Sequence, residues 1–288
     1  MTRWVHISDV QLVRRSKSAT DNTGLAQRMV EQVAAEAPDF VINAGDHING
    51  AVRDGVTERR DVARMWRLYH QVMGPLEAMC PVISVPGNHD QTTQAATSDE
   101  FCRQTHRAGK RAYYGRTIKG VHVVALDTMA RRHEGGFEAG TRQAGWVARD
   151  LTRARAAACT VVVGHYPIFL RPRHCDNDTL RYDDVSGDEG VLLPMLLDGG
   201  VDLYLCGHHH VYERSRYRRL TQVICAANDM AFEGLMDLPA NQHCQVLDER
   251  HCYVRFTLRG QSIRGESIDL KGDVIDAWTQ RLNPRRGR

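Results

Sequence analysis

Short apolar runs alternate with longer helix-like segments along most of the chain. The runs are nearly continuous and rich in β-branched residues, which is typical of strands covered on both faces. They predict strands at residues 4–7, 40–43, 82–85, 121–126, 160–163 and 201–205. The segments between them predict helices at residues 25–36, 60–79, 142–157 and 189–197, with Thr141 as the N-cap of the third. This alternation indicates a layered α/β fold.

The pattern changes after about Arg219. Apolar stretches at 222–226, 252–258 and 263–270 have no long helices between them, which favours antiparallel strands at the end of the chain. We expect these strands to complete a second sheet of the same domain. The predicted organisation is one domain over 1–288, with a motif-bearing core over 1–219, C-terminal strands over 220–280 and a basic tail over 281–288.

Composition narrows the classes of protein that the pattern allows. A chain of 288 residues with 42% hydrophobic content can bury a large core without crosslinks. Its net charge of +3, from 38 basic and 35 acidic residues, favours neither nucleic-acid binding nor binding to a membrane surface. Eight cysteines without a CxxC pair predict reduced, mostly buried thiols. With no signal-like N-terminus and no apolar run of membrane-spanning length, we expect a cytoplasmic protein.

Five polar clusters follow predicted strands at the points where those strands end. They are Ser-Asp-Val-Gln at 8–11, Gly-Asp-His-Ile-Asn at 45–49, Gly-Asn-His-Asp at 87–90, Gly-His at 164–165 and Gly-His-His-His at 207–210. Ligands of open α/β sheets bind beyond the carboxyl ends of the strands, so these clusters are expected to converge. Glycine in four of the five clusters lets the backbone turn sharply and approach closely.

The donors in these clusters are carboxylate, amide and imidazole groups, with no thiolate. That set suits Mn²⁺, Fe, Zn²⁺ or Mg²⁺. A single carboxylate such as Asp46 can bridge two cations held roughly 3.5–4 Å apart, as two-metal hydrolases require. The sequence therefore predicts a centre for two divalent ions, with manganese, iron and zinc left open.

From Ile7 to His210, the order of these motifs resembles that of the calcineurin-like metallophosphoesterases. The resemblance implies a four-layer α/β/β/α sandwich, in which two mixed sheets are flanked by helices and the dimetal site lies at the carboxyl ends of the strands. It implies one metal held by Asp9, Asp46 and His210, with Gln11 as a possible fourth ligand. It implies a second metal held by Asp46, Asn88, His165 and His208.

The same resemblance implies roles for the remaining residues of the third motif. His89 would lie near the leaving group as proton donor or charge stabiliser, and Asp90 would orient it. A hydroxide bridging the two ions would attack phosphorus in line. His47 and His209 adjoin ligands and are expected to point away from the metals, while His6 is expected to lie in the core.

Two branches of this family share features with the chain. Gln11 stands where the family usually has histidine, and this is a feature of the manganese-dependent ADP-ribose and CDP-alcohol pyrophosphatase branch. A neutral amide oxygen is a weaker donor than imidazole. The stretch 201–214 and Gly-His-Tyr-Pro at 164–167 look like purple acid phosphatases, yet Asn49 stands where those enzymes have their tyrosine. The sub-family therefore stays open.

We predict a phosphoester hydrolase acting on a small phosphorylated substrate, with a phosphodiester or nucleotide-type substrate favoured. An acid-phosphatase-like phosphomonoesterase is the alternative. A non-catalytic interaction scaffold is a remote third interpretation, and the ligands argue against it, since only Gln11 departs from the family pattern and His89 is present. Candidate contacts to the substrate phosphate are Arg171, Arg173 and Tyr182 in the polar stretch 169–187, together with Arg214. The oligomeric state is not predicted.

Overall fold

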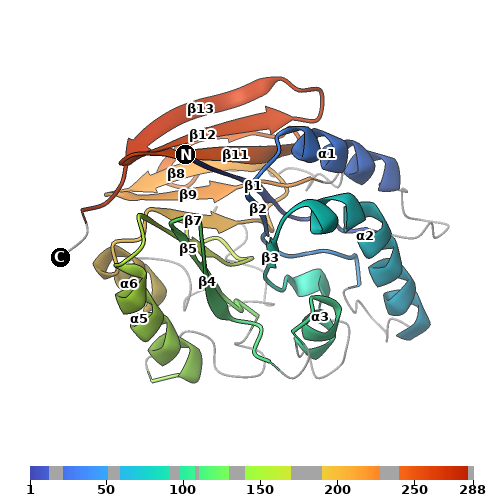
Figure 1. Cartoon of the computed structure of the whole chain (residues 1–288), viewed down its shortest axis with the longest axis horizontal. Helices are drawn as coiled ribbons and strands as arrows, with labels where there is room; N and C mark the ends of the chain where they lie inside the picture. The colour runs from blue at the N-terminus through green and yellow to red at the C-terminus, as the bar shows by residue number, and fades with distance from the viewer. Residues whose placement is uncertain are drawn as a thin grey trace.

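Two mixed β-sheets pack face to face, and helices cover the outer face of each (Figure 1). The computed structural model describes residues 1–12, 22–50, 59–90, 98–107, 110–129, 140–169, 190–227 and 240–284. The predicted four-layer α/β/β/α sandwich is confirmed.

The first sheet has the strand order β13-β12-β11-β1-β2-β3. Its strands are β1 (Thr2–Ile7), β2 (Phe40–Asn43), β3 (Val82–Ser84), β11 (Cys252–Arg259), β12 (Ser262–Asp269) and β13 (Val274–Arg281). β1, β2 and β3 run parallel, so the ends of all three meet at one edge of the sheet. β11 pairs antiparallel with β1 on the other side, and β12 and β13 continue from it as hairpins.

The second sheet has the order β10-β8-β9-β7-β6-β5-β4. Its strands are β4 (Tyr114–Ile118), β5 (Val121–Ala125), β6 (Cys159–Val163), β7 (Leu203–Cys206), β8 (Tyr212–Tyr217), β9 (Leu220–Ile224) and β10 (Cys244–Asp248). β5, β6, β7 and β9 are parallel to one another. Residues at alternate positions of each strand point to opposite faces, which places one apolar set between the sheets and another under the helices.

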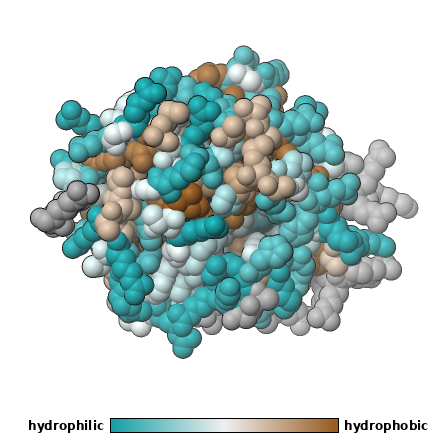
Figure 2. Space-filling model, in the orientation of Figure 1, coloured by the Kyte–Doolittle hydropathy of each residue, from teal (hydrophilic) through white to brown (hydrophobic). Residues whose placement is uncertain are grey.

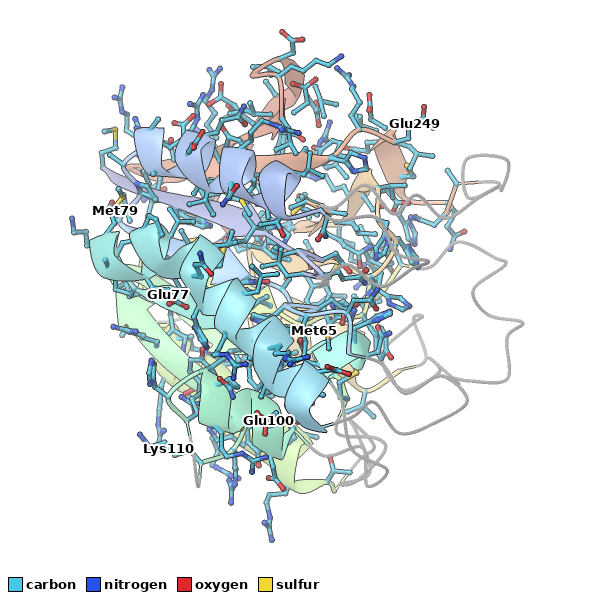
Figure 3. All side chains as sticks on the ribbon, turned by 90° about the vertical axis from the view of Figure 1, so that its right-hand side faces the viewer. Met65, Glu77, Met79, Glu100, Lys110 and Glu249 are labelled. Carbon is cyan, nitrogen blue, oxygen red and sulfur yellow. The ribbon has the colours of Figure 1, made fainter. Side chains whose placement is uncertain are left out.

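The helices lie in two groups. α1 (Thr23–Ala35) and α2 (Arg59–Met79) cover the first sheet, while α5 (Arg142–Ala154) and α6 (Leu192–Asp198) cover the second. Figure 3 shows α1 and α2 side by side, with Met79 at the end of α2. The short α3 (Asp99–Gln104) and the 3-10 turn η1 (Asn88–Asp90) follow β3. Thr141 caps α5 as predicted, because its hydroxyl accepts a hydrogen bond from the Ala144 amide.

The core has three apolar layers, one between the sheets and one under each pair of helices. Trp4 stacks between Phe40 and Phe256 in the central layer, with ring centroids 5.7 and 5.2 Å apart. The face in Figure 2 is mostly hydrophilic, with some hydrophobic residues visible near its centre. Within the described part of the chain, no helix is long and apolar enough to cross a membrane. The seven described cysteines are free.

The C-terminal strands divide between the two sheets. The predicted strands at 252–258 and 263–270 correspond to β11 and β12, and they join the sheet that begins with β1. Among the described strands after Arg219, only β9 and β10 extend the other sheet. The physical reason is that β1 has one open edge, and its register with β11 buries Trp4 against Phe256. Four strands were missing from the sequence analysis: β4, β8, β10 and β13.

Candidate metal centre

The strands β1, β2 and β7 end in turns that force ligand residues into the left-handed region of the backbone. The φ angles are 53° for Asp9, 43° for Gln11, 54° for Asp46, 73° for His208 and 51° for His210. Each such conformation costs a residue with a side chain about 1–2 kcal/mol. Strain of this kind gathers at functional sites, where the surrounding structure holds it in place.

Two glycines let these turns approach one another. A Cβ on Gly87 would lie 2.1 Å from Oδ1 of Asp46, and one on Gly207 would lie 1.9 Å from Oγ of Ser8. Both distances are far below van der Waals contact, so no other residue fits without moving a ligand. The glycines of the third and fifth motifs therefore serve close packing of neighbouring strand ends.

Asp9, Asp46 and His210 form the first group of donors. Their nearest ligand atoms all lie within 4.8 Å of one another, and all three side chains are buried. One oxygen of Asp9 accepts a hydrogen bond of 2.9 Å from the His208 amide. The other, Oδ1, is buried with no hydrogen-bond partner among the described residues, although Nε2 of His210 lies 3.3 Å away. A buried carboxylate oxygen left in this way fits a cation ligand.

Gln11 reaches this first group with its amide. Its Nε2 lies 2.9 Å from Oδ2 of Asp46 and 3.1 Å from Nε2 of His210, while its Oε1 is buried without a hydrogen-bond partner in the described chain. In this orientation the amide donates to Asp46. Exchange of the nitrogen and oxygen positions, which have nearly the same shape, would instead present an oxygen to a cation. Gln11 thus lies at the site, and ligation by it stays a prediction.

Asp46, Asn88, His165 and His208 form the second group of donors. Oδ1 of Asn88 lies 3.0 Å from Nε2 of His165 and 3.0 Å from Nδ1 of His208. Nε2 of His165 lies 3.4 Å from Oδ2 of Asp46, so Asp46 belongs to both groups. Nδ1 of His165 lies 2.8 Å from the Ala44 carbonyl oxygen, to which it can donate a proton and so keep Nε2 free for a metal.

In this second group, attraction between opposite charges counteracts the effect of burial on the pKa values of His165 and Asp46. Burial alone disfavours the charged forms of both His165 and Asp46. The Asp46 carboxylate nevertheless raises the pKa of His165 to about 9. The charges of His165 and His89 hold the pKa of Asp46 well below its usual range. Asp46 is therefore ionised at neutral pH, as a bridging ligand must be.

His89 lies beside these donors, and its backbone amide donates a hydrogen bond of 2.8 Å to Oδ1 of Asp46. Its side chain is partly exposed at the site, and its Nδ1 has no hydrogen-bond partner among the described residues. A role at the leaving group stays a prediction.

Asp90 has partners other than the one predicted from the sequence. Its Oδ2 accepts from the amides of Asp46 and Gly87 and lies 2.9 Å from Nδ1 of His47. Its Oδ1 accepts from the amides of His47 and Ile48. Through these bonds the Asp90 carboxylate holds the turn that carries Asp46. Its expected role in orienting His89 stays a prediction.

His47 and His6 lie in surroundings that agree with the prediction. His47 points away from the donors into a cluster with Trp66, Tyr69 and Phe101. His209 is fully buried beside His208. His6 lies in the core, where burial lowers its pKa to about 3.

The sequence did not predict two residues that hold the backbone of the ligand turns in place. The Asn22 side chain donates to the carbonyls of Val10 and Gln11, which steadies the first ligand turn. The Thr128 hydroxyl accepts from the His165 amide. Both act through backbone groups, so neither leaves a recognisable motif.

The predicted substrate contacts Arg171, Arg173 and Tyr182 lie outside the described residues. Arg214 lies on β8, where its Nε donates a hydrogen bond of 2.7 Å to Asp276 on β13. Its guanidinium also lies 5.0 Å from the Trp278 ring centre and bonds to Gln245. These contacts link the edges of the two sheets, and contact with substrate stays a prediction.

Comparison with known proteins agrees with this geometry. The family model of the calcineurin-like phosphoesterases matches residues 2–212. The chain belongs to this family, as the order of its motifs predicted. The family model is that of phosphoesterases, the class of protein that the motifs predicted.

Among curated relatives, human acid phosphatase type 7 is 25% identical over 205 residues, covering 67% of this chain and 44% of that protein. The chain spans less than half the length of the curated relatives it matches. A solved purple acid phosphatase from yellow lupin seeds superposes with a TM-score of 0.74 at 13% identity, over 99% of this chain and 54% of that one. A dimetal phosphatase from Danio rerio superposes with a TM-score of 0.68 at 14% identity, over 98% and 99%.

Proposed function

We propose that this protein hydrolyses phosphate esters at a centre for two divalent ions. The observation that carries the proposal is the position of Asp46, which belongs to both donor groups. Asp9 and His210 complete one group, and Asn88, His165 and His208 complete the other. When bound, two such ions supply a nucleophilic oxygen at neutral pH and neutralise charge on the phosphoryl group. Their identity among manganese, iron and zinc is open.

The residues of the chain perform the remaining tasks. Asp90 holds the turn of Asp46, and the Ala44 carbonyl fixes the ring of His165. His89 stands beside Asp46 with a partly exposed ring, where it can give a proton to the departing oxygen or stabilise its charge. Fixed donors of this kind lower the reorganisation that the reaction requires.

A small phosphorylated molecule is the proposed substrate, with a phosphodiester or nucleotide-type ester favoured. The balanced charge of the chain counts against a nucleic acid as substrate. A phosphomonoester is the second candidate, and the acid phosphatases among the relatives favour it. The two candidates share the same ions and the same donors, so the metal centre does not choose between them.

A metal-reconstituted activity screen tests the proposal. The purified chain is stripped with a chelator, reloaded in turn with Mn²⁺, Fe²⁺ and Zn²⁺, and assayed with a generic monoester, a generic diester, a cyclic nucleotide and a dinucleotide pyrophosphate. We expect metal-dependent hydrolysis of at least one class. The class with the highest kcat/KM decides between the two candidates, and absence of hydrolysis with every metal contradicts the proposed activity.

Asp46→Asn is the matching variant, because loss of the shared carboxylate weakens both ion sites together. We expect less than one bound ion per chain by elemental analysis and nearly complete loss of turnover. Asp39→Asn is the control, since Asp39 precedes the same strand at its opposite end and pairs with Lys119. Normal metal content and turnover in Asp46→Asn would rule out this assignment.

A further inference from the structure

His47 binds the Asp90 carboxylate at both of its oxygens. The backbone amide of His47 donates to Oδ1 at 2.9 Å, and Nδ1 of the His47 ring lies 2.9 Å from Oδ2. Because Oδ2 also accepts from the amides of Asp46 and Gly87, the ring nitrogen is the donor in this pair. The side chains of His47 and Asp90 are both completely buried. A hydrogen bond to a carboxylate is charge-assisted, and it is stronger than a bond between neutral groups.

Three aromatic side chains surround the His47 ring and hold it in this orientation. Trp66 and Tyr69 lie on α2 and Phe101 lies on α3, with ring centroids 5.5, 5.0 and 5.4 Å from that of His47. All three are buried. Nε2 of His47 has no hydrogen-bond partner among the described residues. The polar contact of the ring is therefore made by Nδ1, and it is directed at the turn beside the metal centre.

Asp90 connects the two turns that carry Asp46 and Asn88. It ends the 3-10 turn η1, which begins at Asn88, and it accepts from the amide of Asp46 in the β2 turn. Asp46 and Asn88 both belong to the second donor group. The relative position of these two ligands thus depends on how firmly the Asp90 carboxylate is held.

The turns of the first donor group are also connected without Asp90. Three backbone hydrogen bonds of 2.9 to 3.1 Å run from amides of the β1 turn to carbonyls of the β2 turn, from Asp9 to Gly45, from Gln11 to Asp46 and from Leu12 to His47. These bonds are made by the backbone, so they do not depend on the side chain at position 47. Loss of the His47 ring should therefore loosen the second donor group more than the first.

We propose that His47 is a positioning residue of the metal centre, which fixes Asp46 relative to Asn88 through Asp90 and thereby sets the affinity for the ion of the second donor group. The inference rests on the proposed function. The His47 ring points away from the donors, so its effect passes through the Asp90 carboxylate. Side chains that orient metal ligands typically contribute about 10- to 100-fold to metal affinity or activity.

Calorimetric titration of the chelator-treated full chain with Mn²⁺ tests the proposal. His47→Asn and His47→Leu introduce side chains of nearly the same size and shape, but only asparagine offers an N–H group at the position of Nδ1. We expect His47→Leu to lower the affinity for one of the two ions by about tenfold or more, and His47→Asn to restore it. His47→Gln, whose amide corresponds to Nε2, takes the place of the leucine variant if that protein does not fold.

The outcomes separate this inference from the proposed function. Wild-type affinity in the variant that lacks the donor overturns the inference. An asparagine variant as weak as the leucine variant also overturns it, since the ring would then act through its shape alone. A wild-type chain that binds no Mn²⁺ overturns the proposed function itself.

His122→Leu is the matched control. His122 is a buried histidine whose Nε2 lies 2.9 Å from Oδ2 of Asp150, so the same substitution breaks the same kind of pair. It lies opposite Thr160, near the start of β6, whereas His165 follows the end of that strand. We expect a lower urea midpoint with unchanged affinity for both ions.

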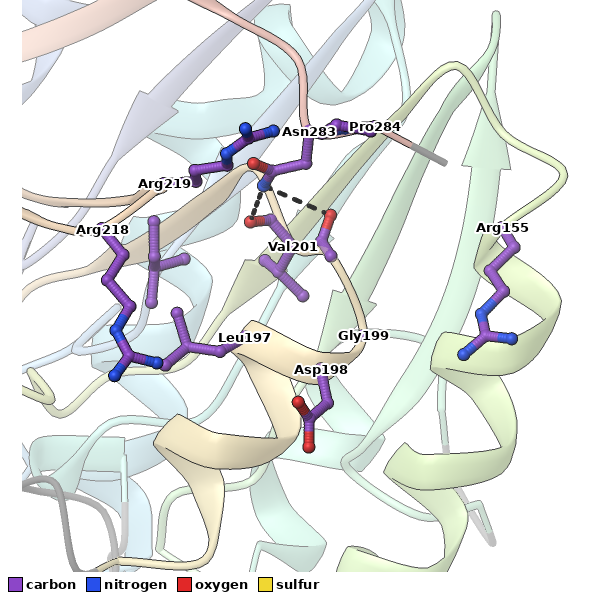
Figure 4. Close-up of a pocket in the computed structure, with 11 residues that line it drawn as sticks. Arg155, Leu197, Asp198, Gly199, Val201, Arg218, Arg219, Asn283 and Pro284 are labelled. Atoms are coloured by element: carbon purple, nitrogen blue, oxygen red, sulfur yellow. Dashed lines mark hydrogen bonds between the residues drawn. The ribbon is translucent and has the colours of Figure 1, made fainter. Parts of the chain in front are cut away.

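Asn283→Leu is a second control, at the far end of β7 from His208. The Asn283 amide donates to the carbonyls of Gly200 and Val201, and Figure 4 shows both bonds. The substitution removes buried hydrogen bonds to a turn without touching the metal centre, so we expect only a loss of stability. Weaker Mn²⁺ binding in either control, equal to that of His47→Leu, would show a general effect of stability and would overturn the proposal.

A double-mutant cycle with Asp90→Asn gives an independent readout. If His47 acts through the Asp90 carboxylate, His47→Leu should change the Mn²⁺ affinity much less in the Asp90→Asn protein than in the wild type. A role in packing alone would not produce this coupling. Additive losses of affinity in the double variant would show that His47 acts independently of Asp90, and would overturn the proposal.

Discussion

Asp90→Asn tests which task this buried carboxylate performs. In the native structure Asp90 accepts from four backbone amides, those of Asp46, His47, Ile48 and Gly87, at 2.9 to 3.3 Å. The asparagine amide has one oxygen and one NH₂ group. Whichever way it turns, the NH₂ faces at least two backbone donors that it cannot satisfy.

The structure sets the size of the expected effect. A hydrogen bond to a charged group contributes about 1.5–3 kcal/mol, and an unsatisfied buried donor costs about as much. Two unsatisfied donors therefore lower the free energy of unfolding by about 3–6 kcal/mol, against a total stability of about 5–15 kcal/mol for a folded domain. Because the freed amides belong to the turn of Asp46, we also expect metal affinity to fall.

Urea denaturation gives the stability, and elemental analysis gives the ion content of the same preparation. Turnover is then compared between an ester with a good leaving group, such as nitrophenol, and an ester of a simple alcohol. We expect equal proportional losses on both. Asp273→Asn is the control, since Asp273 is an exposed carboxylate in the β12–β13 turn. A stable, fully metallated Asp90→Asn protein that loses turnover only on poor leaving groups would show that Asp90 acts through His89, and would refute our reasoning.

Three further predictions concern single residues. His89→Ala should keep both ions and lower turnover by roughly 10²–10⁴, with a smaller loss on nitrophenyl esters; an equal loss on all esters would make His89 a charge stabiliser. Gln11→His should tighten the ion site of Asp9 in a Mn²⁺ titration of the metal-free chain and favour Zn²⁺ or Fe; unchanged affinities would leave the amide without a role as a weak donor. The pKa of His6 is lowered to about 3, so the unfolded chain takes up a proton first as the pH falls below 6.5. The stability that neutral His6 contributes is complete above that pH and is lost toward pH 3. Urea denaturation should therefore show a loss of about 2 kcal/mol from this group between about pH 7 and about pH 5, absent in His6→Leu. Parallel pH profiles for wild type and variant would contradict it.

Much of the fold can be predicted from the sequence because its central strands are covered on both faces. Such strands need continuous β-branched runs, and β2 was predicted with the bounds that the structure has. Strands at the sheet edges carry weaker signals. β4 is mostly exposed, with the sequence Tyr-Gly-Arg-Thr-Ile, and β13 alternates between exposed and half-buried positions. Their pairing is decided by partners far along the chain, which no local pattern reveals.

The chain order of the ligand motifs is also a property of the sequence. Each motif follows a buried strand, and parallel strands bring their ends together whatever the loops between them contain. The sequence alone therefore predicts that Asp46, Asn88, His165 and the two histidines at 208 and 210 belong to one centre. Glycines at 87 and 207 belong to the same pattern, since only they allow neighbouring strand ends to meet.

Only the tertiary structure decided the backbone conformation of the ligand turns and the hydrogen-bond partners of Asp90. The left-handed turns at Asp9 and Asp46 exist because contacts from other segments hold them, and Asp90 serves the β2 turn because η1 points its carboxylate there. Hydrophobic periodicity and local motifs depend on residues close together in the sequence. The direction of a side chain and its contacts with distant segments are fixed only when the two sheets pack together.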